Sequence, residues 1–134
     1  MLQYAAKLRM PDNTTRKERN DRIKEVLEIV QLSDFENSYI RQLSGGQRKR
    51  ASIAVELIAD PSLFFLDEPT SGLDPGTERS IMQTLQNMSK MGKTIILVTH
   101  NTLNLHLCDK VAFFAPGGRL CFFGHPQEAL NFFG

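Results

Sequence analysis

Two short apolar runs, separated by a segment with helical signals, constrain the fold of this sequence more than any other feature. Leu63–Leu66 and Thr94–Val98 are of strand length, and the second is rich in β-branched residues. Between them, Asp74 followed by Pro75 is typical of a helix start, because aspartate can cap the helix and proline is favoured at its first position. Strand, helix and strand in this order predict a βαβ unit with a parallel sheet whose strands are buried on both faces.

The residues before the first apolar run indicate helices. Thr15 and Glu18 have capping-box spacing, and an apolar stripe follows them at the intervals of one helix face. A further helix is expected over Gly46–Ala59. The residues predicted to be buried on these helices are Ile23, Val26, Leu27, Val30, Ala51, Ala54, Leu57 and Ile58. We therefore predict a helical subdomain over residues 1–60 and a core of strands and helices over residues 61–134.

The end of the sequence predicts a hairpin and a last helix. Val111–Phe114 and Leu120–Phe123 flank Pro116-Gly117-Gly118, which is a turn signal. Pro126 then begins a segment with helical character. The fold class expected for the whole sequence is therefore α/β.

Charge and cysteine content exclude several functional classes. Sixteen basic and fifteen acidic residues give a net charge of +1, which argues against a nucleic-acid partner. Cys108 and Cys121 are too widely spaced for a Cys-x-x-Cys motif and too few for a disulfide framework, so we expect reduced thiols in a cytosolic setting. No apolar run approaches the ~20 residues that a spanning helix needs, and the first ten residues do not resemble a signal peptide.

The run Leu-Ser-Gly-Gly-Gln at Leu43–Gln47 could bind an anion. A serine before two glycines at a helix start leaves backbone N–H groups accessible, and the helix dipole favours negative charge there. Taken alone, the run is better explained as a capped helix after a flexible loop, because Ser-Gly-Gly is common in loops.

Asp67 and Glu68 follow the first apolar run directly. They are therefore expected at the carboxyl end of a strand, the edge where open α/β sheets bind ligands. One carboxylate could hold Mg²⁺ and the other could orient an attacking water. A lone Asp-Glu pair could also be only a polar strand end.

Three other groups could carry chemistry by residue type. His100 follows the second apolar run and could reach a phosphoryl oxygen, although for a lone histidine a structural role at a strand end is favoured. Gly92-Lys93-Thr94 resembles the end of a phosphate-binding loop. That motif needs another glycine at position 87, where this sequence has Asn87, and a helix after the lysine, where a strand is expected here. We therefore expect a helix-to-strand turn. The basic triplet Arg48–Arg50 is expected on a solvated helix face.

In combination and in this order, the motifs resemble those of the ATPase domains of ABC transporters. Leu43–Gln47 resembles the family's signature motif, Leu63–Glu68 its Walker B strand and His100 its switch histidine. The segment similar to the D-loop consists of Ser71, Gly72, Leu73 and Asp74. Gln47–Ala54 and Gly117–Gly124 are similar to the G subfamily, the eye-pigment and sterol half-transporter type. The resemblance covers essentially the whole sequence and implies a partial P-loop NTPase fold.

The resemblance implies hydrolysis of ATP with Mg²⁺, coupled to transport. Glu68 would be the catalytic carboxylate, Asp67 the acid on the Mg²⁺ side, directly or through water, and His100 the γ-phosphate switch. The signature residues that would close on nucleotide held by a second ABC ATPase domain, in a head-to-tail dimer, are Ser44, Gly45, Gly46 and Gln47. The resemblance also implies a transmembrane partner domain and a place at the cytoplasmic face of a membrane.

The family's Walker A loop and glutamine loop, which precede its helical subdomain, are not found in the sequence; Gln3 does not match the glutamine-loop context. Two interpretations follow. The sequence is the C-terminal part of an ATPase domain, or it is a non-catalytic module that cannot bind ATP alone. Without the central strand of the family's sheet, the apolar faces of Leu63–Leu66 and Thr94–Val98 are expected to be partly uncovered.

Overall fold

The computed structural model describes residues 1–133, and the chain divides into two compact units. The first unit is Met1–Thr99 and the second begins at His100.

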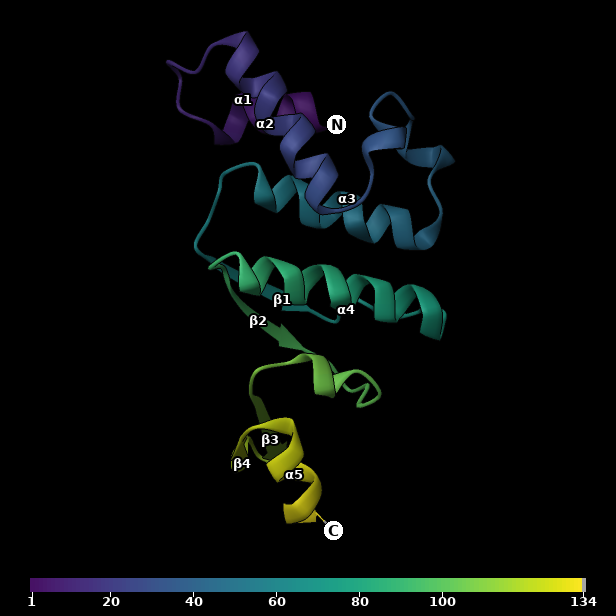
Figure 1. The fold of residues 1–134 in the computed structure, drawn as a ribbon, viewed down its shortest axis with the longest axis vertical. Coiled ribbons are helices and arrows are strands. Elements are labelled where there is room, and N and C mark those ends of the chain that lie inside the picture. Colours follow the sequence, from purple (N-terminus) through teal and green to yellow (C-terminus); the bar gives the residue numbers. More distant parts are fainter. Residues whose placement is uncertain (134) are drawn as a thin grey trace. The chain divides into compact units, whose positions relative to one another are not determined.

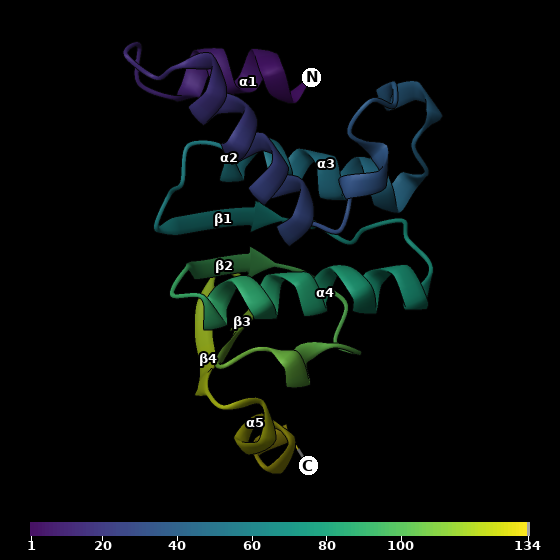
Figure 2. The same ribbon diagram turned by 45° about the horizontal axis from the view of Figure 1, so that its top comes forward.

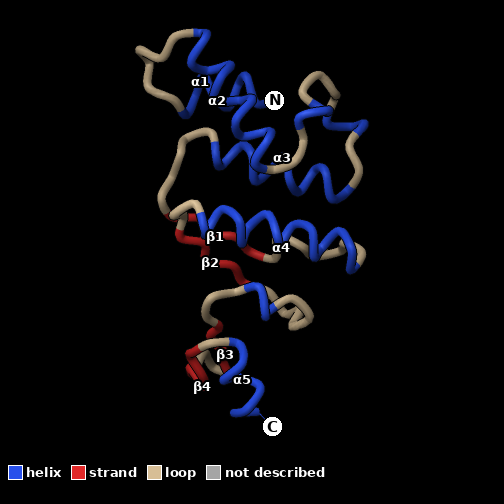
Figure 3. Tube along the Cα trace, in the orientation of Figure 1, coloured by secondary structure: helices blue, strands red, loops and turns tan. Residues whose placement is uncertain are grey.

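The first half of the first unit is helical (Figure 3). Its α-helices are α1 (Leu2–Arg9), α2 (Arg16–Ile29) and α3 (Gly45–Leu57), with short 3₁₀ turns η1 (Ser33–Phe35) and η2 (Ile40–Gln42) between the last two. The three α-helices pack on one another, and α3 packs on the next helix of the chain (Figure 1). The predicted stripes are confirmed, because all eight of their residues are buried: Ile23, Val26, Leu27, Val30, Ala51, Ala54, Leu57 and Ile58.

Helix α2 begins with the predicted capping box. The Glu18 N–H donates to Thr15 Oγ1 at 3.2 Å, and the Thr15 N–H donates to Glu18 Oε2 at 2.7 Å. The Thr15 backbone donor, which favours the carboxylate form, holds the pKa of Glu18 below its usual range. Two backbone donors at the helix start, which have no partner within the helix, are thereby satisfied.

The second half of the first unit is the predicted βαβ unit. Strands β1 (Leu63–Asp67) and β2 (Thr94–Val98) pair in parallel, with Leu63 opposite Thr94 and Asp67 opposite Val98. Figure 2 shows the two arrows pointing the same way beside the connecting helix α4 (Pro75–Lys90). Helix α4 buries Ile81, Met82, Leu85 and Met88 and contacts β2.

The expectation that both strands are buried on both faces is wrong. Phe64 is 3% exposed, whereas its neighbour Phe65 is 70% exposed, and on β2 the side chains of Ile96 and Val98 are also exposed. Burial therefore alternates along each strand, because helices cover only one face of this two-stranded sheet. The expectation that these apolar strands are partly uncovered is confirmed.

The second unit contains the predicted hairpin and last helix. Strands β3 (Val111–Ala115) and β4 (Arg119–Gly124) are antiparallel with an irregularity between Phe113 and Phe114, and α5 (Pro126–Phe133) packs on β4 and on the 3₁₀ turn η3 (Leu105–Leu107). The core of this unit is aromatic. Its ring contacts join Phe113, Phe122, Phe132 and Phe133.

None of the helices among residues 1–133 is both long enough and apolar enough to span a bilayer.

Candidate functional site

The loop before α3 is a capped helix start. The Gln47 N–H donates to Ser44 Oγ at 3.2 Å, and the Ser44 N–H donates to Gln47 Oε1 at 2.8 Å, so the two residues form a capping box. The predicted cap is thus confirmed, with the helix beginning at Gly45. Ser44 and Gly45 are both exposed, and the exposed start of a 13-residue helix carries the positive end of its dipole.

The two glycines of this loop have different surroundings. A Cβ added to Gly45 would have Leu73 Cδ2 as its nearest neighbour at 3.6 Å, an ordinary contact. A Cβ added to Gly46 would lie 2.3 Å from Thr77 Cγ2, and Gly46 is buried. The interpretation that both glycines leave room for a ligand is therefore corrected. Gly45 is open to solvent, whereas Gly46 is required by close packing of α3 on α4.

The same contacts bring the Ser44–Gln47 loop onto the segment that follows β1. Gly45 faces Leu73 and Gly46 faces Thr77, and Lys49 Nζ lies 3.5 Å from the backbone carbonyl oxygen of Glu68. Residues predicted separately as a signature motif, a strand-end carboxylate and a D-loop are therefore neighbours within the first unit. Their order along the chain is evident in the sequence, whereas their contact is evident only in the structure.

Asp67 and Glu68 occupy the carboxyl end of β1, as predicted. Asp67 is the last residue of the strand and is exposed, and Glu68 is half-buried. The Glu68 N–H donates to the Val98 carbonyl at 2.9 Å, which continues the pairing with β2 by one residue. Glu68 has a φ of 47°, in the left-handed region. Such a conformation costs a non-glycine residue roughly 1–3 kcal/mol and is concentrated at functional sites.

The segment Ser71–Asp74 leads directly into α4, which begins at Pro75. Asp74 caps this helix, since the Thr77 N–H donates to Asp74 Oδ1 at 3.0 Å. Hydrogen bonding to Thr77 holds the pKa of Asp74 below its usual range. Ser71 and Gly72 are exposed, and Gly72 has a φ of 76°, which a side chain would disfavour.

His100 is the first residue of the second unit, two positions after the end of β2, and its side chain is exposed. Its participation in the site remains a prediction. Among residues 1–133 no group of three or more His, Cys, Asp or Glu side chains could hold a metal ion.

Gly92-Lys93-Thr94 is a helix-to-strand turn, as predicted. Gly92 has a φ of 91° at the end of α4, and Lys93 Nζ pairs with Asp60 Oδ1 at 2.6 Å. This lysine is thus engaged with the linker between α3 and β1.

Sequence reasoning missed the role of Arg50. The expectation of a solvated basic triplet fits Arg48, which is exposed, and is wrong for Arg50, which is only 8% exposed. A signal was available, because Arg50 stands at helical spacing from Ala54 and Leu57 on the buried stripe of α3.

Comparison with known proteins gives one family. The family model described as "ABC transporter" matches residues 2–71. An ABC transporter ATP-binding/permease protein of Mycobacterium tuberculosis is 46% identical over 127 residues, which cover 95% of this chain and 15% of that protein. The broad substrate specificity ATP-binding cassette transporter ABCG2 of Bos taurus is 46% identical over 140 residues, covering 99% of this chain and 21% of the relative. The chain thus spans about a fifth or less of the length of these curated relatives.

A solved structure has the same fold. The structure of cbiO1 from Clostridium perfringens, described as part of the ABC transporter complex cbiONQ, aligns with a TM-score of 0.88 at 32% identity and covers 97% of this chain and 52% of that one. Protein white of Drosophila melanogaster is 40% identical over 140 residues, which cover 98% of this chain and 20% of that protein. The α/β fold is therefore a partial P-loop ABC ATPase fold, and the chain belongs to the ABC transporter family.

Proposed function

We propose that this chain is part of an ATP-hydrolysing nucleotide-binding domain that powers a transporter. In this assignment residues 1–60 form the helical subdomain, which carries the signature motif, and residues 61–134 form the C-terminal part of the ATPase core. The observation that carries the proposal is the contact between the capped Ser44–Gln47 loop and the segment after β1, because it gathers three ATPase motifs in one unit.

Glu68 is proposed as the catalytic carboxylate. It directly follows the last residue of β1 and has a left-handed backbone conformation. From there its carboxylate orients and polarises a water that attacks the γ-phosphorus of ATP. The new P–O bond forms to the water oxygen while the bond from the γ-phosphorus to the β–γ bridging oxygen breaks, and the water proton leaves toward the carboxylate or a phosphate oxygen. His100 is proposed to contact a γ-phosphate oxygen.

Asp67 fits a role at Mg²⁺. Its carboxylate is exposed at the carboxyl end of β1, and carboxylate oxygens are ligands that Mg²⁺ accepts directly or through its waters. A bound Mg²⁺ would neutralise charge that develops on the phosphate oxygens. Asp67 and Glu68 thereby divide two tasks between adjacent positions.

The Ser44–Gln47 loop is proposed to act on nucleotide held by a second ABC ATPase domain. Exposed Gly45 allows close approach of a phosphate, and the dipole of α3 favours its negative charge. The Ser44 hydroxyl is satisfied by the Gln47 N–H in this structure, and it can exchange that partner for a phosphate oxygen. Because the loop itself contains no lysine, it acts as the second side of a head-to-tail sandwich. The exposed Ser71 and Gly72 are proposed to line the same domain interface.

A transmembrane partner domain and a place at the cytoplasmic face of a membrane complete the proposal. Both rest on family membership. A non-catalytic module is the alternative, since the 134 residues contain no Gly-x-x-x-x-Gly-Lys-[Ser/Thr] run.

The test is Glu68→Gln in a complete nucleotide-binding domain that carries this sequence. The amide keeps the shape of the side chain and loses the charge that polarises water, so ATP binding should persist while hydrolysis falls by orders of magnitude. Asp34→Asn, at an exposed aspartate of η1, is the matched control for loss of one carboxylate. Near-normal turnover of the Glu68→Gln protein would refute the catalytic assignment.

A further inference from the structure

Helices α2 and α3 cap each other through arginines. The last carbonyls of a helix have no partner within it, and a cation near them also interacts favourably with the negative end of the dipole. Arg22 of α2 donates to carbonyls at the end of α3, and Arg50 of α3 donates to the carbonyl that ends α2. Carbonyls at the C-terminal end of each helix are thus bonded by an arginine of the other helix.

Arg50 also ties α3 to α4. Its Nη1 donates to the Val30 carbonyl at 2.9 Å and to Gln31 Oε1 at 2.9 Å, both at the end of α2. Its Nη2 donates to Ser80 Oγ, and Nη1 is 3.4 Å from Thr84 Oγ1, both on α4. One buried guanidinium therefore joins three helices, and all four of these acceptors are uncharged oxygens.

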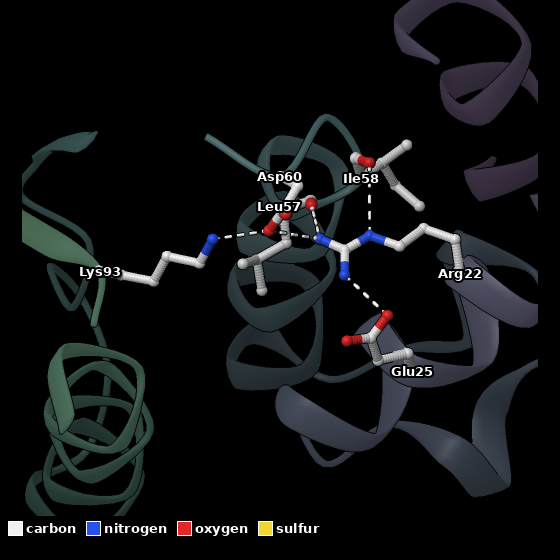
Figure 4. A network of polar contacts seen from close by, with 6 residues as sticks. All are labelled: Arg22, Glu25, Leu57, Ile58, Asp60 and Lys93. Carbon is white, nitrogen blue, oxygen red and sulfur yellow. Dashed lines mark hydrogen bonds and ion pairs between the residues drawn. The ribbon is translucent and has the colours of Figure 1, made fainter. Parts of the chain in front are cut away.

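Arg22 holds the other end of α3 (Figure 4). Its Nη2 donates to the Leu57 carbonyl at 2.6 Å and to Asp60 Oδ1 at 3.1 Å. The same Asp60 oxygen pairs with Lys93, the residue before β2, and the Arg22 side chain is 14% exposed. The end of α3 is thereby linked both to α2 and to the sheet.

We propose that Arg50, supported by Arg22 at the far end of α3, is a positioning residue that sets the direction of α3 and hence of the Ser44–Gln47 loop. This proposal rests on the proposed function of that loop. Ser44 is six residues before Arg50, about 9 Å along a helix at 1.5 Å per residue. A rotation of α3 about the Arg50 contacts would therefore displace the loop directly.

The geometry of the guanidinium is essential to this role. Arginine presents a planar fork of donors that can reach two helices at once, whereas lysine offers a single compact ammonium. Loss of the fork should leave the core of α3 folded, because Ala51, Ala54 and Leu57 remain buried. The expected effect is a misdirected loop in a folded domain.

The experiment compares Arg50→Gln, Arg50→Lys and the control Arg48→Gln in a complete nucleotide-binding domain that carries this sequence. The control removes one positive charge from an exposed position on the same helix, nearer the loop. Nucleotide affinity is measured with a fluorescent ATP analogue, turnover by phosphate release, and local order by hydrogen exchange at the Gln47 amide, which bonds to Ser44 Oγ.

Both Arg50 variants should lower turnover on the order of 10–100-fold, the effect of a displacement of about 1 Å, with nucleotide affinity within about twofold of the parent. Amide exchange at the start of α3 should accelerate more than exchange in α1. Arg48→Gln should leave all three readouts unchanged. Equal losses of affinity and turnover, uniform acceleration of exchange, or full activity of Arg50→Lys would each overturn the positioning role.

Failure of the proposed function is distinguishable. If the parent domain binds ATP and does not hydrolyse it, the function is wrong, and the exchange readout still tests Arg50. If the parent hydrolyses ATP and Arg50→Gln does so equally with unchanged exchange, only the inference about Arg50 is wrong.

Discussion

Gly46→Ala should destabilise the first unit, whereas Gly45→Ala should not. A Cβ on Gly46 would lie 2.3 Å from Thr77 Cγ2, and because carbon atoms pack at about 3.5 Å or more, α3 and α4 must separate by about 1 Å or Thr77 must change rotamer. Overpacking of this kind costs about 1–3 kcal/mol, and the gain in helix propensity offsets at most ~1 kcal/mol of it. With the full offset, the expected net loss in the free energy of unfolding is up to about 2 kcal/mol.

Urea unfolding followed by circular dichroism measures this difference. Gly45→Ala is the matched control, since its Cβ would meet only Leu73 at 3.6 Å, and it should be neutral or stabilise by up to ~1 kcal/mol. Thr77→Ser removes the clashing methyl group and keeps the hydroxyl, so the double variant Gly46→Ala/Thr77→Ser should recover most of the loss relative to Thr77→Ser alone. Equal stability of the two alanine variants, or no coupling to Thr77, would refute the packing explanation.

Three further predictions concern binding, stability and pH. The 134-residue polypeptide alone should bind Mg·ATP weakly and not hydrolyse it, because its residues contain no phosphate-binding loop; low-micromolar affinity in a titration, or steady turnover, would contradict this. Ser44→Ala should cost about 1 kcal/mol of unfolding free energy through loss of the cap, and Ser44→Thr much less, as urea titration would show. The hydrogen bond from Lys93 and the nearby charge of Arg22 hold the pKa of Asp60 below its usual range, so its stabilising effect is full above the ordinary carboxyl pKa and is lost as pH falls through the lowered value. Asp60→Asn should therefore destabilise by less than ~1 kcal/mol at neutral pH and by nothing at about pH 2, and an equal effect at both would argue against the ion pair.

Local signals in the sequence were sufficient for most of the fold. The three caps at Thr15, Ser44 and Asp74 are each made by a side chain and a backbone N–H three residues later, so short-range spacing identifies them. The same holds for the apolar periodicity of α2 and α3.

Tertiary contacts explain what the sequence did not reveal. Asp60 and Lys93 are 33 positions apart, and nothing in either neighbourhood indicates the pairing. Gly46 was interpreted as open because a glycine in sequence does not show whether solvent or Thr77 fills the missing side chain's place. Arg50 was assigned to solvent because basic residues are rarely fully buried, and hydrogen-bond acceptors at the end of α2 and on α4 make its burial tolerable.

Mixing two inactive variants tests most directly whether Glu68 and the Ser44–Gln47 loop act in separate subunits of one site. Glu68→Gln removes the carboxylate. Gly45→Asp places a negative charge where phosphate is proposed to bind, and it should fold because the position is open and an acid is favoured at a helix start. Each variant of the complete nucleotide-binding domain should be inactive alone.

In a head-to-tail dimer, a mixed pair has one site that contains the intact Glu68 of one subunit and the intact loop of the other. Half of the dimers in an equal mixture are mixed, and in each mixed dimer one of the two sites is intact. Hydrolysis should therefore return to about a quarter of the parent rate. A double variant carrying both changes in one chain, mixed with either single variant, is the control and should stay inactive. Recovery in the first mixture alone is the predicted result; no recovery on mixing two folded, ATP-binding variants would contradict the account.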